Sequence, residues 1–203
     1  MLATTGLGII RGERAVFTDI DLAVEPGEAV VLRGPNGAGK STLLRILAGL
    51  LSPTVGRVTW DGAAIADDRE AHGRRLRYAG HGDALKLALT AFDNLAFWAR
   101  FEGTPVEAVD DALDRLGLGA LGMLPAGVMS AGQKRRLGLA RLALAPRPLW
   151  LLDEPTVSLD AASVDLLAGM IWDHRAAGGM VVVATHDGLS LPNARTFVLE
   201  KAA

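Results

Sequence analysis

A glycine-rich loop carries the clearest chemistry in this chain. Residues 34–42 read GPNGAGKST and stand between the apolar run AVVLR and the helix-forming run LLRILAGL. The spacing of Gly34, Gly39, Lys40 and Ser41 is typical of a loop whose backbone N–H groups surround a nucleotide phosphate at a helix N-terminus. A plain glycine turn before a helix is the alternative interpretation.

We predict that this segment, called the phosphate loop below, binds a nucleotide together with Mg²⁺. Lys40 is expected to reach the β- and γ-phosphates, and the Ser41 hydroxyl is expected to hold the metal. Thr42 should lie near the α-phosphate. The expected nucleotide-binding residues of the loop are Gly34, Pro35, Asn36, Gly37, Ala38, Gly39, Lys40, Ser41 and Thr42.

Two other apolar runs end in side chains suited to hydrolysis of a phosphate bond. LWLLDEP places Asp153 and Glu154 at the end of one run, and VVVATHD places His186 at the end of another. We expect Asp153 to hold Mg²⁺ through water and Glu154 to polarise an attacking water as general base. His186 can donate to the γ-phosphate. The catalytic candidates are thus Lys40, Glu154 and His186, although an acidic turn and a surface histidine are the alternatives.

A second candidate anion site precedes the basic run KRR. Ser130, Ala131, Gly132 and Gln133 read SAGQ, which is a capping box with Ser130 at the N-cap and Gln133 at N3. A cap alone does not account for Gly132, which costs a helix about 1 kcal/mol relative to alanine. We interpret this glycine as allowing a ligand to approach the backbone, so that the helix start binds a γ-phosphate.

The elements that must position these residues are strands alternating with helices. PLWLLD and GMVVVAT are apolar throughout, which is typical of parallel strands covered by helices on both faces. Ligands bind at the carboxyl edge of such a sheet. We therefore predict an α/β fold, with short β-type runs over 1–65 and TFVLE as an edge strand.

Residues 82–128 are expected to be helical instead. Thr90 can cap a helix that continues to Gly103, with Asp93 at N3. A second helix is predicted to begin with Thr104 as N-cap and Pro105 at N1. Its apolar stripe consists of Val106, Val109, Leu113 and Leu116.

Length and composition limit the function classes. The 203 residues suffice for one α/β domain with a small subdomain, and 21 Lys and Arg balance 23 Asp and Glu, which argues against nucleic acid as a partner. Cysteine is absent, so disulfides and cysteine metal sites are excluded. The N-terminus lacks a signal-peptide pattern and the apolar runs are too short to span a bilayer. A role at a membrane is therefore expected to come through a partner.

Along essentially its whole length the chain resembles the ATP-binding cassette family. GPNGAGKST, MSAGQ, LWLLDE, VSLD and His186 correspond in order to the Walker A, signature, Walker B, D-loop and switch-histidine motifs. The resemblance implies a RecA-like P-loop core with an N-terminal antiparallel β subdomain over 1–81 and 130–203, and a helical subdomain over 82–129. It also implies a head-to-tail homodimer in which the signature, with Asp160, completes the ATP site of the other copy.

Two positions depart from the family pattern. His81 stands where the family has a glutamine that senses Mg²⁺ and the attacking water, so we expect it on the metal side of the site; the alternative is that it only ends a strand. Arg11 stands where an aromatic residue stacks on adenine. A guanidinium plane can also stack on a base, and Phe17 is the nearest aromatic substitute.

The departures, with HGDALKLALTAFDNLAFW and the short chain, resemble one branch of the family, the ATPase subunits of haem exporters in bacterial cytochrome c maturation. That branch implies a CcmB-type permease and other cytochrome c maturation proteins as partners, and a peripheral position at the cytoplasmic face of the inner membrane. An exporter of another cargo and a soluble cassette ATPase that acts outside transport are the alternatives.

Overall fold

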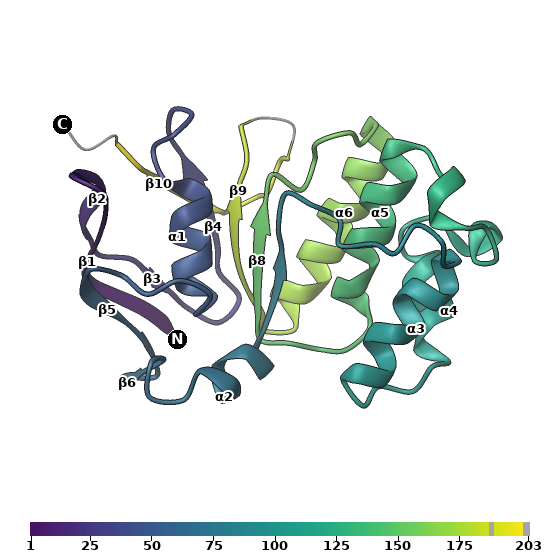
Figure 1. Ribbon diagram of the computed structural model, residues 1–203, viewed down its shortest axis with the longest axis horizontal. Coiled ribbons are helices and arrows are strands. Elements are labelled where there is room, and N and C mark those ends of the chain that lie inside the picture. The colour runs from purple at the N-terminus through teal and green to yellow at the C-terminus, as the bar shows by residue number, and fades with distance from the viewer. Residues whose placement is uncertain (187–188, 201–203) are drawn as a thin grey trace.

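A five-stranded parallel sheet forms the centre of the computed structural model, which describes residues 1–186 and 189–200 (Figure 1). Its strand order is β10-β4-β9-β8-β7. The strands are β4 (Ala29–Arg33), β7 (Leu76–Ala79), β8 (Leu149–Asp153), β9 (Met180–Ala184) and β10 (Arg195–Val198). The α/β prediction, the two fully buried strands β8 and β9 and the edge strand β10 are confirmed. Strand β7 was considered only in the alternative that His81 ends a strand, and its bounds were not predicted. Residues 187–188 and 201–203 of the core expected over 130–203 lie outside the described residues.

The two faces of this sheet bury alternate side chains. Val30, Leu32 and Val182 belong to a core shared with α1 (Lys40–Leu47). Val31 and Val183 belong to a second core, shared with the helices on the opposite face. Because both faces are covered, the strands can be apolar at every position, as their sequences indicated.

A second, antiparallel sheet packs over α1 (Figure 1). Its strands are β1 (Leu2–Arg11), β2 (Arg14–Ile20), β3 (Ala23–Val24), β5 (Val55–Trp60) and β6 (Ala63–Ala64). The order is β2-β1-β5-β6, and β3 pairs with β1. The long strand β1 was not individually predicted. Its pairing shifts register between Leu7 and Ile9 against β2, and between Thr5 and Gly8 against β5. Such irregularities interrupt the alternation of side chains by which a strand is predicted from sequence.

The remaining helices gather mainly at the other end of the molecule (Figure 1). They are α2 (Arg69–Arg74), α3 (Ala91–Phe101), α4 (Ala108–Asp114), η1 (Gly119–Leu121), η2 (Ala126–Val128), α5 (Ala131–Ala140), η3 (Arg141–Ala143) and α6 (Ala161–Ala176). Buried residues of α3, α4, α5 and α6 form one continuous core with the parallel sheet. None of the helices in the described part of the chain has the length and apolar character needed to cross a bilayer.

The two predicted helix starts over 82–128 had different outcomes. The Thr90 cap is confirmed, because its hydroxyl accepts a hydrogen bond from the Asp93 N–H at 3.0 Å. The start at Thr104 and Pro105 is wrong, since α4 begins at Ala108. The N–H of Ala108 bonds to the Pro105 carbonyl, three residues back, so the chain forms a tighter turn there before the α-helix. Of the predicted apolar stripe, Val109, Leu113 and Leu116 are buried, and Val106 is partly buried against the same core.

His72 links α2 to the end of α1, the helix that follows the phosphate loop. Its imidazole is fully buried, and Nε2 lies 2.8 Å from the carbonyl oxygen of Leu47. Nδ1 makes no hydrogen bond with the described residues. Burial lowers the pKa of His72, because a charged imidazolium loses its hydration there.

The buried His72 predicts a loss of stability in mild acid. The unfolded chain takes up a proton near the usual histidine pKa of about 6.5, whereas the folded protein resists protonation. The free energy of unfolding should therefore fall as the pH drops from about 7 towards 5. Urea unfolding across this range should show a weaker pH dependence for His72→Gln, which keeps a donor but does not titrate. Equal pH dependence in the two proteins would contradict the assignment.

Candidate functional site

The phosphate loop has its shape because three of its glycines adopt left-handed backbone angles. Gly34, Gly37 and Gly39 have φ of 141°, 81° and 100°. A Cβ on Gly34 would lie 2.2 Å from the Leu199 carbonyl oxygen, and one on Gly39 would lie 2.8 Å from the Phe17 ring. The loop thus needs glycine both for its φ angles and for its close packing.

Lys40 lies inside this loop with 7% of its surface exposed. Its Nζ donates to the carbonyl of Gly34 at 2.8 Å and lies 3.4 Å from that of Pro35. His186 Nε2 is also 3.4 Å from Nζ. The ammonium therefore faces the same small space as the imidazole predicted to act with it.

The two predicted metal-holding oxygens of the loop and of β8 are neighbours. The Ser41 hydroxyl donates to Asp153 Oδ1 at 2.9 Å, and Asp153 is 2% exposed. Tyr78, from strand β7, lies 3.4 Å from the other carboxylate oxygen. Burial raises the pKa of Tyr78, so the phenol stays protonated and can donate to Asp153. Tyr78 is thus a part of the site that sequence reasoning missed.

Glu154 and His186 face each other across the ends of β8 and β9. The imidazole Nε2 lies 3.4 Å from Glu154 Oε1, and the His186 N–H donates to Oε2 at 3.3 Å. Glu154 has φ of 49°, a left-handed conformation that costs a non-glycine residue about 1–2 kcal/mol. Its N–H donates to the Ala184 carbonyl at 2.8 Å, which helps to hold this conformation.

An open cavity of about 550 Å³ joins these groups. Most of the phosphate loop, Glu154 and His186 line it, together with Arg11, Val16 and Val157. Arg11, at the end of β1, therefore lies at the same cavity as the phosphate loop. Phe17 is 2% exposed and packs beneath the loop, so its ring offers no free face for stacking.

The SAGQ turn is a complete capping box in the structure. Ser130 Oγ accepts from the Gln133 N–H at 3.2 Å, and Gln133 Oε1 accepts from the Ser130 N–H at 2.8 Å. A Cβ on Gly132 would lie 2.8 Å from the Ser158 carbonyl oxygen. Close packing within the chain therefore accounts for a glycine at position 132 without a bound ligand. Ser130, Ala131, Gly132 and Gln133 do not line the phosphate-loop cavity.

Asp160, two residues after Ser158, caps α6. Its carboxylate accepts from the Ser163 N–H at 2.8 Å, and hydrogen bonds from Ser163 hold the pKa of Asp160 below its usual range. The carboxylate therefore stays ionised at neutral pH. It has a structural partner in the same chain besides any role at a nucleotide.

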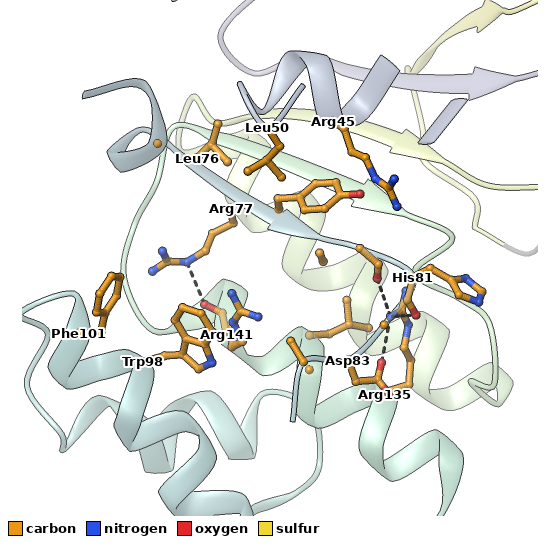
Figure 2. Close-up of a pocket in the computed structure, with 18 of the residues that line it drawn as sticks. Arg45, Leu50, Leu76, Arg77, His81, Asp83, Trp98, Phe101, Arg135 and Arg141 are labelled. Carbon is orange, nitrogen blue, oxygen red and sulfur yellow. Dashed lines mark hydrogen bonds and ion pairs between the residues drawn. The ribbon is translucent and has the colours of Figure 1, made fainter. Parts of the chain in front are cut away.

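His81 is not brought to the phosphate-loop cavity in this conformation. It follows the end of β7 at Ala79 and lines a separate cavity of about 620 Å³ between the sheet and α3. Figure 2 shows its ring at the margin of that cavity. Within residues 1–186 and 189–200, no cluster of three or more His, Asp or Glu side chains forms a protein-only metal site.

Comparison with known proteins agrees with the motifs. The ABC transporter family model matches residues 17–157, from β2 through the phosphate loop and signature to the turn after β8. The cytochrome c biogenesis ATP-binding export protein CcmA of Rhodospirillum rubrum is 53% identical over 194 residues, covering 96% of this chain and 83% of that protein. CcmA of Paramagnetospirillum magneticum is 50% identical over 201 residues, covering 97% and 93%.

Solved structures show the same fold. A dimeric bacterial ABC transporter cassette matches with a TM-score of 0.85 at 26% identity, covering 98% of this chain and 94% of that one. A dimeric cassette in a post-hydrolysis state, bound to ADP and phosphate, matches with a TM-score of 0.80 at 26% identity, covering 92% and 88%.

The packing of Gly132 against Ser158 predicts the sign of a stability change. Gly132→Ala should lower the free energy of unfolding, because the new Cβ displaces the Ser158 backbone. Gly169→Ala, in the middle of α6 with no neighbour within 4 Å of a Cβ, should raise it by about 0.5–1 kcal/mol. Urea unfolding of both variants measures the contrast. A stabilised Gly132→Ala would show that the Ser158 contact is unimportant.

Proposed function

This chain belongs to the ABC transporter family, and we propose that it is the ATP-hydrolysing subunit of an ABC exporter that moves haem in cytochrome c biogenesis. Its relatives of about 50% identity are cytochrome c biogenesis export proteins that match nearly the full length of this chain. The observation that carries the ATPase function is one cavity lined by the phosphate loop and by the Glu154–His186 pair.

The proposed site binds ATP with Mg²⁺. The Ser41 hydroxyl and the Asp153 carboxylate fit this ion, because Mg²⁺ prefers hard oxygen ligands and these two oxygens lie 2.9 Å apart. When bound, Mg²⁺ neutralises phosphate charge. Lys40, which now donates to loop carbonyls, has its ammonium in place to bind β- and γ-phosphate oxygens.

Hydrolysis needs one water activated beside the γ-phosphate. Glu154 accepts a proton from that water while the water oxygen attacks phosphorus, and the bond to the ADP oxygen breaks. His186 Nε2 lies 3.4 Å from Glu154 Oε1, close enough to orient the carboxylate. In this proposal the imidazole also donates to the γ-phosphate. ADP and inorganic phosphate are the products.

A second copy of the chain completes each site in this proposal. Its Ser130–Gln133 turn contributes backbone N–H groups and a hydroxyl at a helix N-terminus, where anions are favoured. Asp160 reaches the same interface, and the Gly132–Ser158 packing connects the two segments. Arg11 stacks on the adenine and His81 approaches the metal side on closure. Solved dimers of similar cassettes support a dimeric working unit.

The proposed membrane partner is a CcmB-type permease acting with other cytochrome c maturation proteins. Residues 82–129 form the helical subdomain, which transmits closure of the dimer to the permease. Exposed apolar side chains on this subdomain support a docking surface for the permease, since Phe97 and Phe101 on α3 are 57% and 75% exposed. The subunit then lies at the cytoplasmic face of the inner membrane, without nucleic acid as a partner.

Glu154→Gln tests the proposed base. The amide cannot accept the proton, so turnover should fall by about 10²–10⁴-fold while ATP binding is retained. Phosphate release and equilibrium binding of ATP measure the two properties. Glu70→Gln, an exposed change on α2, should leave both unaffected. Near-normal turnover of Glu154→Gln would exclude this base.

Ser130→Asp tests the second phosphate site. Aspartate is as good an N-cap as serine, so a purely structural turn should keep its stability and its activity. If the turn meets a γ-phosphate, the added negative charge should abolish ATPase activity without unfolding the chain. Ser130→Asn, which caps without the charge, is the matched variant. Equal activity of the two variants would show that no anion binds there.

A further inference from the structure

Arg135 is a buried cation that the mechanism above does not use. It lies in α5, two residues after the SAGQ turn, and is 5% exposed. One side of its guanidinium binds the turn that follows β8. Nη2 donates to the carbonyls of Asp153 at 3.1 Å and Glu154 at 2.9 Å, and Nε donates to that of Pro155 at 3.2 Å.

The other side of the same guanidinium binds the segment between β7 and α3. Nη1 donates to the Gly80 carbonyl at 3.0 Å and to Asp83 Oδ1 at 3.0 Å, and lies 3.4 Å from the His81 carbonyl (Figure 2). Gly138, one helical turn after Arg135, packs against the Asp83 backbone, with a virtual Cβ 3.1 Å from its carbonyl oxygen. One face of α5 therefore holds this segment at two points.

On the β8 side, Arg135 contacts Glu154, the proposed catalytic base, whose carboxylate must be placed accurately. Glu154 has a left-handed backbone that an acidic residue does not adopt without restraint. Its N–H is held by Ala184 and its carbonyl by Arg135. A rotation of this peptide would move the carboxylate away from His186.

We propose that Arg135 is a positioning residue for ATP hydrolysis. Its hydrogen bonds fix the backbone of Glu154 and connect this residue to residues 80–83, the segment that leads into the helical subdomain. The position of the carboxylate then depends on where that segment lies. This inference rests on the proposed role of Glu154 and adds a residue to the same site.

The planar fork of arginine is required for this role. Three nitrogens reach acceptors on two separate segments, whereas a lysine ammonium is a single point of donation. Arg136 provides a matched control on the same helix. Its Nη1 donates to the carbonyls of Leu116 at 2.9 Å and Gly117 at 3.3 Å, which belong to neither of the segments that Arg135 contacts.

Steady-state ATPase kinetics of the full chain separate the two arginines. Arg135→Lys should lower kcat on the order of 10- to 100-fold and leave KM and ATP binding nearly unchanged, because misplacing a catalytic group affects the chemical step. Arg136→Lys should keep kcat within about twofold. Equal kcat values for the two variants would overturn the proposal.

A double-mutant cycle with Glu154→Gln tests whether Arg135 acts through Glu154. If it does, adding Arg135→Lys to Glu154→Gln should lower turnover no further. Multiplicative losses would assign Arg135 a merely structural role. If Glu154→Gln alone keeps normal turnover, the proposed base itself fails, which is a distinct result.

Hydrogen exchange gives a readout that does not need activity. Arg135→Lys should accelerate amide exchange in both 80–83 and 153–155, whereas Arg136→Lys should accelerate it only around 116–118. Unchanged exchange in the first two segments would show that the guanidinium does not hold them together.

Discussion

The site depends on the in-register pairing of three parallel strands. Ala184 of β9 lies opposite Leu32 of β4 on one side and opposite Asp153 of β8 on the other. Because parallel strands end at a common edge, this register places the phosphate loop, Glu154 and His186 around one cavity. Each strand is buried on both faces, so a shift in register would expose apolar side chains or bury polar ones.

Around this edge of the sheet, backbone carbonyls determine the packing as much as side chains do. The Leu199 carbonyl excludes any side chain at position 34, and the Ser158 carbonyl does the same at 132. The guanidinium of Arg135 donates to carbonyls of the turn after β8 and of the segment after β7. Packing around the phosphate loop and the β8 turn thus depends on contacts with main-chain atoms, which tolerate little movement.

Sequence reasoning went wrong where local signals did not decide the backbone pairing. Thr104 as N-cap and Pro105 at N1 predicted a helix start, but the chain makes a backbone bond from Ala108 to Pro105, three residues back, and α4 begins only at Ala108. The bounds of strand β7 were not predicted, because its four residues carry no clear alternation of apolar and polar side chains. Phe17 looked available for stacking, yet the hydrophobic core between the sheets buries it.

The sequence by itself determined the α/β class, the phosphate loop and the residues at the strand ends, since glycine spacing and fully apolar strands are local signals. Only the tertiary structure decided which neighbours those residues have. It showed Tyr78 beside Asp153, Gly132 against Ser158 and Arg135 between two segments. Such contacts join positions 18 to 75 residues apart, and no spacing along the chain encodes them.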